Sequence, residues 1–309
     1  IRNVVQFLES IQPEPGDWRY KLRRAQEILG YGNVHVALGA ALLGCAVQAL
    51  ASLPWSLVSC LMPALFVFPM HSMNSYLNRG SLQWNDPGRA AFYHRWRLLF
   101  IILSAIAVSL SLVLALHIGF MTFLALALML VVGLIYSFPD AFPQDVQRWT
   151  VFRVTTIPNS KTLFVPLAWS MVIAIVPYLS EHLAHFGKLL FAAWVVFGLV
   201  FTRTALLDLL AIRGDRLVGK ETLVVQIGER RTVRVLRVVL AILACSLVLG
   251  PFLRLSSWFA LILLGAVGAY WLTLALPDEG QWKEDPLFEL MVESVLVGSG
   301  AFGLIWQAL

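Results

Sequence analysis

Long apolar runs that recur along the whole chain are the feature that most limits how it can fold. Nine runs are candidate membrane spans, at approximately 33–51, 55–77, 97–116, 118–137, 161–178, 187–208, 232–252, 256–276 and 286–306. A helix needs about 20 apolar residues to cross a bilayer. Of the 309 residues, 59% are hydrophobic and 13% are charged, and the mean hydropathy is +0.77. A soluble domain of this length could not bury so much apolar surface, so we predict a polytopic membrane protein.

The same runs predict an all-α fold. Only helices and closed barrels satisfy their backbone hydrogen bonds inside lipid, and these runs are too long and too continuous for barrel strands. We expect residues 1–309 to form a single membrane domain. In it, an amphipathic leader at 1–32 lies on the membrane surface and a bundle of nine helices follows at 33–309.

Cations collect in the leader and in two long linkers, at 78–96 and 209–231. With nine spans, all three regions lie on one side of the membrane. Cytoplasmic loops carry an excess of Lys and Arg, so we predict that this side faces the cytoplasm and that the membrane is the inner, cytoplasmic one. The linker at 277–285 is acidic and weakens the rule locally. The net charge of +5 is explained by these loops, and no nucleic-acid binding is predicted.

The three cysteines Cys45, Cys60 and Cys245 lie inside apolar runs and lack the spacing of metal ligands. Free cysteine behaves as a small hydrophobic residue. We therefore expect neither a disulfide framework nor a zinc site.

Two aspartates lie at the end of the sixth apolar run. Thr204, Asp208, Ala211 and Asp215 share one helical face if the helix continues through them. Carboxylates beside lipid are costly and usually mark a substrate or ion site, and their oxygens suit a hard cation such as Mg²⁺. An interfacial cluster of salt bridges that anchors the helix end is the alternative. The cations available to neutralise a phosphate nearby are Arg203, Arg213, Arg216 and Lys220.

A second polar face lies on the second run, where His71, Asn74 and Asn78 follow i, i+3, i+7 spacing. Such a face can line a cavity, or it can form hydrogen bonds between helices. Tyr136 closes the fourth run and Lys161 opens the fifth. Both are predicted on the side of the aspartates, where an interfacial tyrosine and a snorkelling lysine are the simpler interpretations.

Over nearly its whole length the chain resembles the UbiA superfamily of intramembrane prenyltransferases. The most specific match begins at Asp208 and runs through Asp215 to Thr222 and Leu223, which is similar to the second aspartate-rich motif of that family. Weaker matches are Tyr136 to Pro139 at the end of the fourth run, Lys161 to Trp169 in the fifth, and the segment from Asn85 through Arg89.

The first aspartate-rich motif of that family, Asn-Asp-x-x-Asp-x-x-x-Asp, is degenerate here. Asn74, Ser75, Asn78 and Leu82 align with it, so its asparagine is present and its three aspartates are absent. In the second motif, Ala211 replaces a frequent aspartate. Asp86, a few residues beyond the first motif, is an alternative carboxylate.

The resemblance implies a membrane-embedded enzyme that moves a prenyl group from an isoprenyl diphosphate to a lipophilic or aromatic acceptor. It implies that Mg²⁺ is bound by Asp208 and Asp215 with Asn78, and that Asn74 supports this site. His71 would orient the acceptor or accept its proton. The residues expected to contact substrate are Arg89, Tyr136, Lys161, Arg213, Arg216 and Lys220. Two alternatives are a non-catalytic UbiA-fold subunit that binds lipid or scaffolds partners, and a UbiA-type terpene cyclase.

Overall fold

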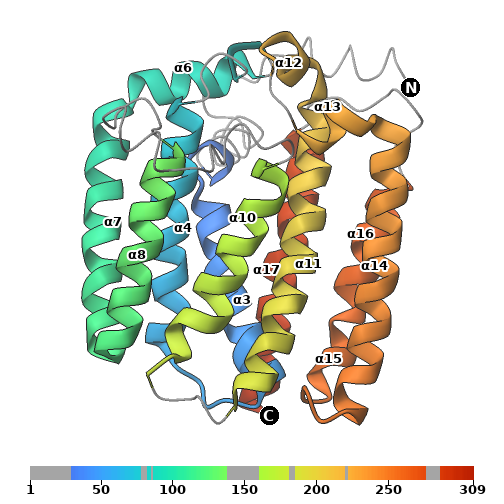
Figure 1. Cartoon of the computed structure of the whole chain (residues 1–309). Helices are drawn as coiled ribbons and strands as arrows, with labels where there is room; N and C mark the ends of the chain where they lie inside the picture. The colour runs from blue at the N-terminus through green and yellow to red at the C-terminus, as the bar shows by residue number, and fades with distance from the viewer. Residues whose placement is uncertain are drawn as a thin grey trace, which may run out of the picture.

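The computed structural model describes residues 29–77, 82–84, 86–137, 160–180, 185–219, 222–275 and 286–309. Within these ranges all regular structure is helical, and the long helices stand side by side in one bundle (Figure 1). The predicted all-α class is therefore confirmed. Most of the predicted leader at 1–32 lies outside the described residues.

Each of the nine predicted runs contains a helix where the structure describes it. The first four form α3 (Val34–Ala51), α4 (Leu57–Leu77), α7 (Arg97–Ile118) and α8 (Phe120–Ser137). The fifth forms α10 (Ser160–Ser170), followed by the π-helical turn η3 (Met171–Ile175) and the 3-10 turn η4 (Val176–Tyr178). The last four form α11 (Phe186–Leu210), α14 (Glu229–Phe252), the pair α15 (Phe259–Ile262) and α16 (Leu264–Thr273), and α17 (Pro286–Ala308).

Six of the described helices are long and apolar enough to cross a membrane: α3, α4, α7, α11, α14 and α17. The other three runs give shorter apolar helices, at Phe120–Ile135, Thr162–Tyr178 and Phe259–Thr273. The chain is thus an integral membrane protein by length and composition of its helices, and the number of nine spans stays a prediction.

Helix α11 occupies the centre of the bundle. In its apolar window 72% of the residues are buried, against 28% in α7. Helix α11 packs against α3, α10, α14 and α17, whereas α7 turns large apolar side chains outward, among them Leu98 and Ile106. Apolar residues on an outer face are stable in lipid, because lipid does not penalise their exposure. The polar residues near the end of α11, namely Thr202, Arg203, Thr204 and Asp208, are therefore inside the bundle.

Glycines bring α3 and α17 into close parallel contact. A side chain at Gly300 would lie 2.1 Å from the backbone of Leu42, and one at Gly303 would lie 2.7 Å from the Cα atom of Ala46. Small residues allow membrane helices to approach this closely, and van der Waals packing then holds them together. The first and last described helices therefore lie against one another and close the bundle.

Three short helices cover the end of the bundle where α4 and α11 finish: α6 (Pro87–Arg95), α12 (Ile212–Leu217) and α13 (Leu223–Ile227) (Figure 1). Asp86 caps α6 by accepting a hydrogen bond from the Arg89 backbone N–H at 2.9 Å, with proline at the start of the helix. Both residue types are favoured at these positions. Asp86 thereby fixes where α6 begins, and the alternative that it serves as a site carboxylate finds no support in this contact.

Candidate active site

Asp208 lies in the last turn of the central helix α11 and is only 1% exposed. The Thr162 hydroxyl of α10 donates a hydrogen bond to Asp208 Oδ2 at 2.9 Å. The same hydroxyl oxygen lies 3.5 Å from the backbone nitrogen of Leu223, the first residue of α13. Three elements thus meet at this carboxylate, and the hydrogen bond lowers the cost of burying it.

Asp215 lies on α12, just after the chain leaves α11. The helix is interrupted at Ala211, but the Asp215 backbone N–H still donates to the Ala211 carbonyl at 3.0 Å. The predicted face is therefore nearly preserved, and Asp215 is 2% exposed. Arg213 and Arg216 on the same short helix are exposed. Helix α12 thus places its carboxylate inside the protein and its guanidinium groups outside.

Two buried hydroxyls accompany these carboxylates. Thr204 lies one turn before Asp208, and Thr222 lies immediately before α13. They are 4% and 2% exposed, and neither hydroxyl oxygen makes a hydrogen bond to any described residue. Buried polar groups are nearly always paired with protein, water or a ligand. These two hydroxyls lie on α11 and at the start of α13, which packs against both helices that carry the carboxylates, and they retain hydrogen-bonding capacity for water or a ligand.

An aromatic ring of α10 contacts both the polar face of α4 and a side chain of α11. His71 packs edge-on against Trp169 of α10, with ring centroids 5.6 Å apart. The guanidinium of Arg203 lies over the same indole ring, 5.3 Å from its centroid. Asn74 is half-buried. Trp169 therefore joins the predicted polar face of α4 to α11.

Arg203 forms a buried ion pair that the sequence did not reveal. Its Nε donates to Glu293 Oε2 of α17 at 2.9 Å, and its second nitrogen donates to the other carboxylate oxygen. The side chains are 4% and 5% exposed. Arg203 was expected among the phosphate-binding cations, but here its charge is neutralised inside the bundle.

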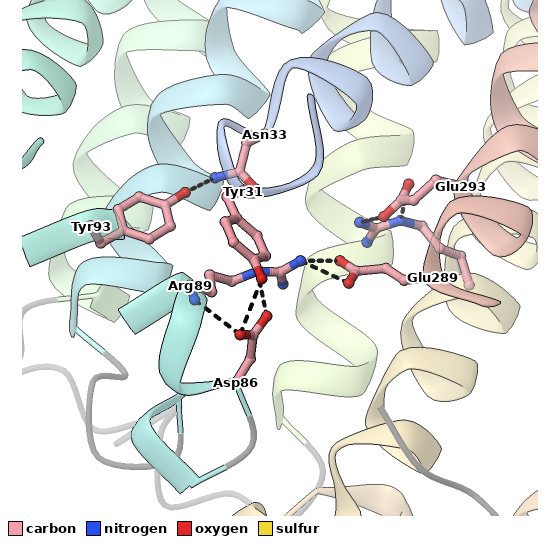
Figure 2. Close-up of polar contacts among 8 residues, drawn as sticks. Tyr31, Asn33, Asp86, Arg89, Tyr93, Glu289 and Glu293 are labelled. Atoms are coloured by element: carbon pink, nitrogen blue, oxygen red, sulfur yellow. Dashed lines mark hydrogen bonds and ion pairs between the residues drawn. The ribbon is translucent and has the colours of Figure 1, made fainter. Parts of the chain in front are cut away.

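A second ion pair joins α6 to α17 (Figure 2). One Arg89 nitrogen donates to both oxygens of Glu289, at 2.8 and 2.7 Å. The Arg89 guanidinium also lies 5.1 Å from the centre of the Tyr31 ring, whose hydroxyl donates to Asp86 at 3.3 Å. Burial alone would lower the pKa of Arg89, but the Glu289 carboxylate raises it above its ordinary value, so Arg89 stays charged.

The remaining predicted site residues are only partly covered. Tyr136 and Lys161 occupy the end of α8 and the start of α10, as predicted, but their side chains lie outside the described part of the chain. Asn78 and Lys220 lie outside the described residues altogether. The structure thus joins Asp208 to the start of α10, buries Asp215 on the next helix, and pairs Arg89 with Glu289.

Sequence reasoning missed Glu289 and Glu293. One signal was available, because they are two carboxylates spaced i, i+4 near the start of an apolar run, where a charge is unusual. Their partners are separated from them by 200 and 90 residues, and local spacing does not identify such partners.

The metal-binding capacity of the described residues is limited. Among them no group of three or more His, Cys, Asp or Glu side chains is placed to hold a metal ion. Mg²⁺ is commonly bound through one or two carboxylates, with water and substrate phosphate completing its shell. The two carboxylates Asp208 and Asp215 match, in type and number, what one such ion takes from a protein when phosphate and water supply its other ligands.

Comparison with known proteins identifies a family match and similar folds. Residues 94–285 match the UbiA prenyltransferase family, and no curated protein sequence matches the chain. A UbiA homologue from Archaeoglobus fulgidus, bound to GPP and Mg²⁺, has a TM-score of 0.65 at 15% identity, over 92% of this chain and 100% of its own. The apo structure of a UbiA homologue from Aeropyrum pernix K1 has a TM-score of 0.62 at 16% identity, over 89% and 98%. A structure described as digeranylgeranylglyceryl phosphate synthase has a TM-score of 0.53 at 15% identity, over 93% and 99%.

Proposed function

Because the chain belongs to the UbiA prenyltransferase family, we propose that it moves a prenyl group from an isoprenyl diphosphate to a lipophilic or aromatic acceptor in the membrane. The observation that carries this proposal is the burial of both Asp208 and Asp215 where α10, α11, α12 and α13 meet. Two similar structures are described as bound to Mg²⁺ with GPP or with DMAPP. A diphosphate with Mg²⁺ needs carboxylate oxygens on the protein side.

In this proposal Asp208 and Asp215 hold one Mg²⁺ ion, with Asn78 as a further oxygen ligand and Asn74 supporting the site from α4. When bound, the ion offsets the charge that develops on the diphosphate as its carbon–oxygen bond breaks. The buried surroundings strengthen this effect, because electrostatic interactions are stronger where water is excluded. The Thr162 hydroxyl keeps the Asp208 carboxylate oriented through its 2.9 Å hydrogen bond.

Cations at the same end of the bundle would bind the phosphate oxygens. Arg213 and Arg216 are exposed on the helix that carries Asp215, and we assign the same role to Lys161 and Lys220. Arg89 would first have to leave Glu289, to which it is bound at 2.7 and 2.8 Å. More arginine and lysine at the diphosphate compensates for the carboxylates missing from the first motif, because fewer metal ions then need to be held.

The acceptor is assigned to the side of the site formed by α4. His71, which packs against Trp169, would orient the acceptor or take up the proton it loses, and Tyr136 at the end of α8 would contact substrate. The cations of this end suit the cytoplasmic side, so we propose a multi-pass protein of the inner membrane whose site faces the cytoplasm.

One observation favours a second candidate function. The positions aligned with the first motif, Asn74, Ser75, Asn78 and Leu82, hold no carboxylate. Asp86, the nearest alternative, caps α6 and contacts Tyr31 instead. A subunit of this fold that binds a lipid or scaffolds partners would have no need of the missing aspartates, because the same fold can carry unrelated functions.

One binding experiment distinguishes the transferase from the non-catalytic subunit. It measures the binding of a non-hydrolysable geranylgeranyl diphosphate analogue to the purified protein, with and without Mg²⁺. We expect binding that requires Mg²⁺ and weakens at least tenfold, about 1.4 kcal/mol, in Asp208→Asn and in Asp215→Asn. Both substitutions keep the side-chain shape and remove the charge. Glu229→Gln is the matched control, because Glu229 opens α14 at the same end of the bundle. It is not part of the proposed diphosphate site, the Arg203–Glu293 pair or the Arg89–Glu289 pair.

Binding that is indifferent to Mg²⁺ and equal in all four proteins would contradict the transferase proposal. Lipids and proteins that co-purify with the chain would then be identified, because the second candidate function predicts a bound lipid or a partner subunit.

A further inference from the structure

Cys45 of α3 and Cys60 of α4 place their sulfur atoms 3.3 Å apart. The two side chains are 5% and 3% exposed. Both are free, buried thiols in the structure, whereas Cys245 on α14 is free and exposed. A thiol is only a weak hydrogen-bond donor, so the close approach contributes little as a hydrogen bond between two thiols.

The surrounding residues hold the two sulfurs in place. A side chain at Gly44 would lie 3.1 Å from the Cα atom of Cys60, so glycine at this position lets α3 and α4 approach closely. The Gln48 side chain accepts a hydrogen bond from the Ser56 backbone N–H at 3.0 Å and donates to the Ser56 carbonyl at 3.1 Å. It also donates to the Cys60 sulfur at 3.5 Å. The short connection between α3 and α4 is thus clamped beside the cysteine pair.

We propose that Cys45 and Cys60 form an intramolecular disulfide that joins α3 to α4. The sulfur–sulfur bond is about 2.05 Å long, so the two sulfurs have to approach by roughly 1.3 Å, which side-chain rotation can supply. Two S–H bonds break and one S–S bond forms. Two protons and two electrons pass to a disulfide of a thiol–disulfide oxidoreductase, which is reduced to two thiols.

The position of the pair suits this chemistry. The connection between α3 and α4 lies at the end of the bundle opposite α6 and α12 (Figure 1). If α6 and α12 face the cytoplasm, as proposed, the cysteine pair lies nearer the outer side, where disulfides form and persist. Buried cysteines react poorly, so the bond forms before α3 and α4 finish packing and resists reductants once the protein is folded.

Counting the reactive thiols tests the proposal. The protein is purified from membranes of an aerobically grown host, denatured in detergent with a maleimide present, and weighed intact before and after reduction and a second labelling. We expect one labelled cysteine, Cys245, before reduction and all three after it. Three labelled cysteines before reduction would overturn the proposal.

Two variants make the assignment specific. Cys245→Ser should show no labelled cysteine before reduction and two afterwards. Cys45→Ser should show two before reduction and the same two afterwards, because Cys60 has lost its partner. A Cys45→Ser protein that still has a single reactive thiol would overturn the pairing. The oxidised protein should also run as a monomer on a non-reducing gel, and a reducible dimer would refute an intramolecular bond.

Discussion

Glu293 and Glu289 lie one turn apart on α17, and each binds an arginine from another helix, but their surroundings differ. The Arg203–Glu293 pair joins two membrane-spanning helices, with 4% and 5% of the side chains exposed. The Arg89–Glu289 pair joins α17 to the short helix α6, with 20% and 30% exposed. A buried pair is costly to break because removal of one partner leaves the charge of the other uncompensated in an apolar medium. When a pair that reaches solvent is broken, water solvates the remaining charge. The same type of contact therefore contributes much more to stability in the buried pair than in the partly exposed one.

The largest effect is expected from Glu293→Gln, which keeps the shape of the side chain but leaves the Arg203 charge buried. We expect a loss of about 3–5 kcal/mol of folding stability, measured by denaturant unfolding in detergent micelles. The double variant Arg203→Met/Glu293→Leu should recover most of this loss, because it buries no charge at all. If Glu293→Gln costs no more than Glu289→Gln, the contrast between the two pairs is wrong.

A smaller effect is expected from Glu289→Gln, about 1 kcal/mol or less. Arg89 retains Asp86, 3.7 Å away, and the ring of Tyr31 in this variant. Raising the salt concentration should shrink the difference from wild type, since solvent ions screen exposed charges. The same salt series should leave the effect of Glu293→Gln unchanged. Equal salt dependence of the two variants would show that water reaches both pairs.

The smallest effect concerns Tyr93, an uncharged contact beside the exposed pair. Its hydroxyl accepts a hydrogen bond from the Asn33 side chain at 2.5 Å, and burial raises its pKa above the ordinary value. Above a pH of about 10 the unfolded chain releases this proton while the folded protein retains it. The contribution of the protonated Tyr93 hydroxyl to folding stability is therefore complete below that pH and is lost as the pH rises further. Unfolding of wild type and Tyr93→Phe between pH 8 and 11 should show the steeper fall in wild type, and parallel curves would contradict this origin.

The sequence was sufficient for the helices because their signal is local. The run at 187–208 became α11 at Phe186–Leu210, and the run at 97–116 became α7 at Arg97–Ile118. The division of the fifth run into α10, η3 and η4 was not predicted. Hydropathy measures how apolar a segment is and does not respond to the hydrogen-bonding pattern within it.

The candidate site was predicted in part for the same reason. Both Asp208 and Asp215 are buried, although the helix expected to carry both is interrupted at Ala211, so that they lie on α11 and α12. The partners Glu289 and Glu293 are joined to their arginines across 200 and 90 residues. In helices that are apolar all round, periodicity does not show which face meets which neighbour. Arg203 was therefore assigned to phosphate, although the fold pairs it with Glu293.

The close contact between α3 and α17 has a consequence for how the protein is made. Helix α17 leaves the ribosome after every other described helix, so the face of α3 that Gly300 and Gly303 approach stays uncovered until α17 is made. Helix α17 also carries both Glu289 and Glu293. Until then Arg203 sits in the membrane without its carboxylate, and α6 without its link to α17. The insertion of α17 thus covers α3, neutralises the buried Arg203 charge and links α6 to the bundle, so the surroundings of the candidate site are complete only once α17 is in place.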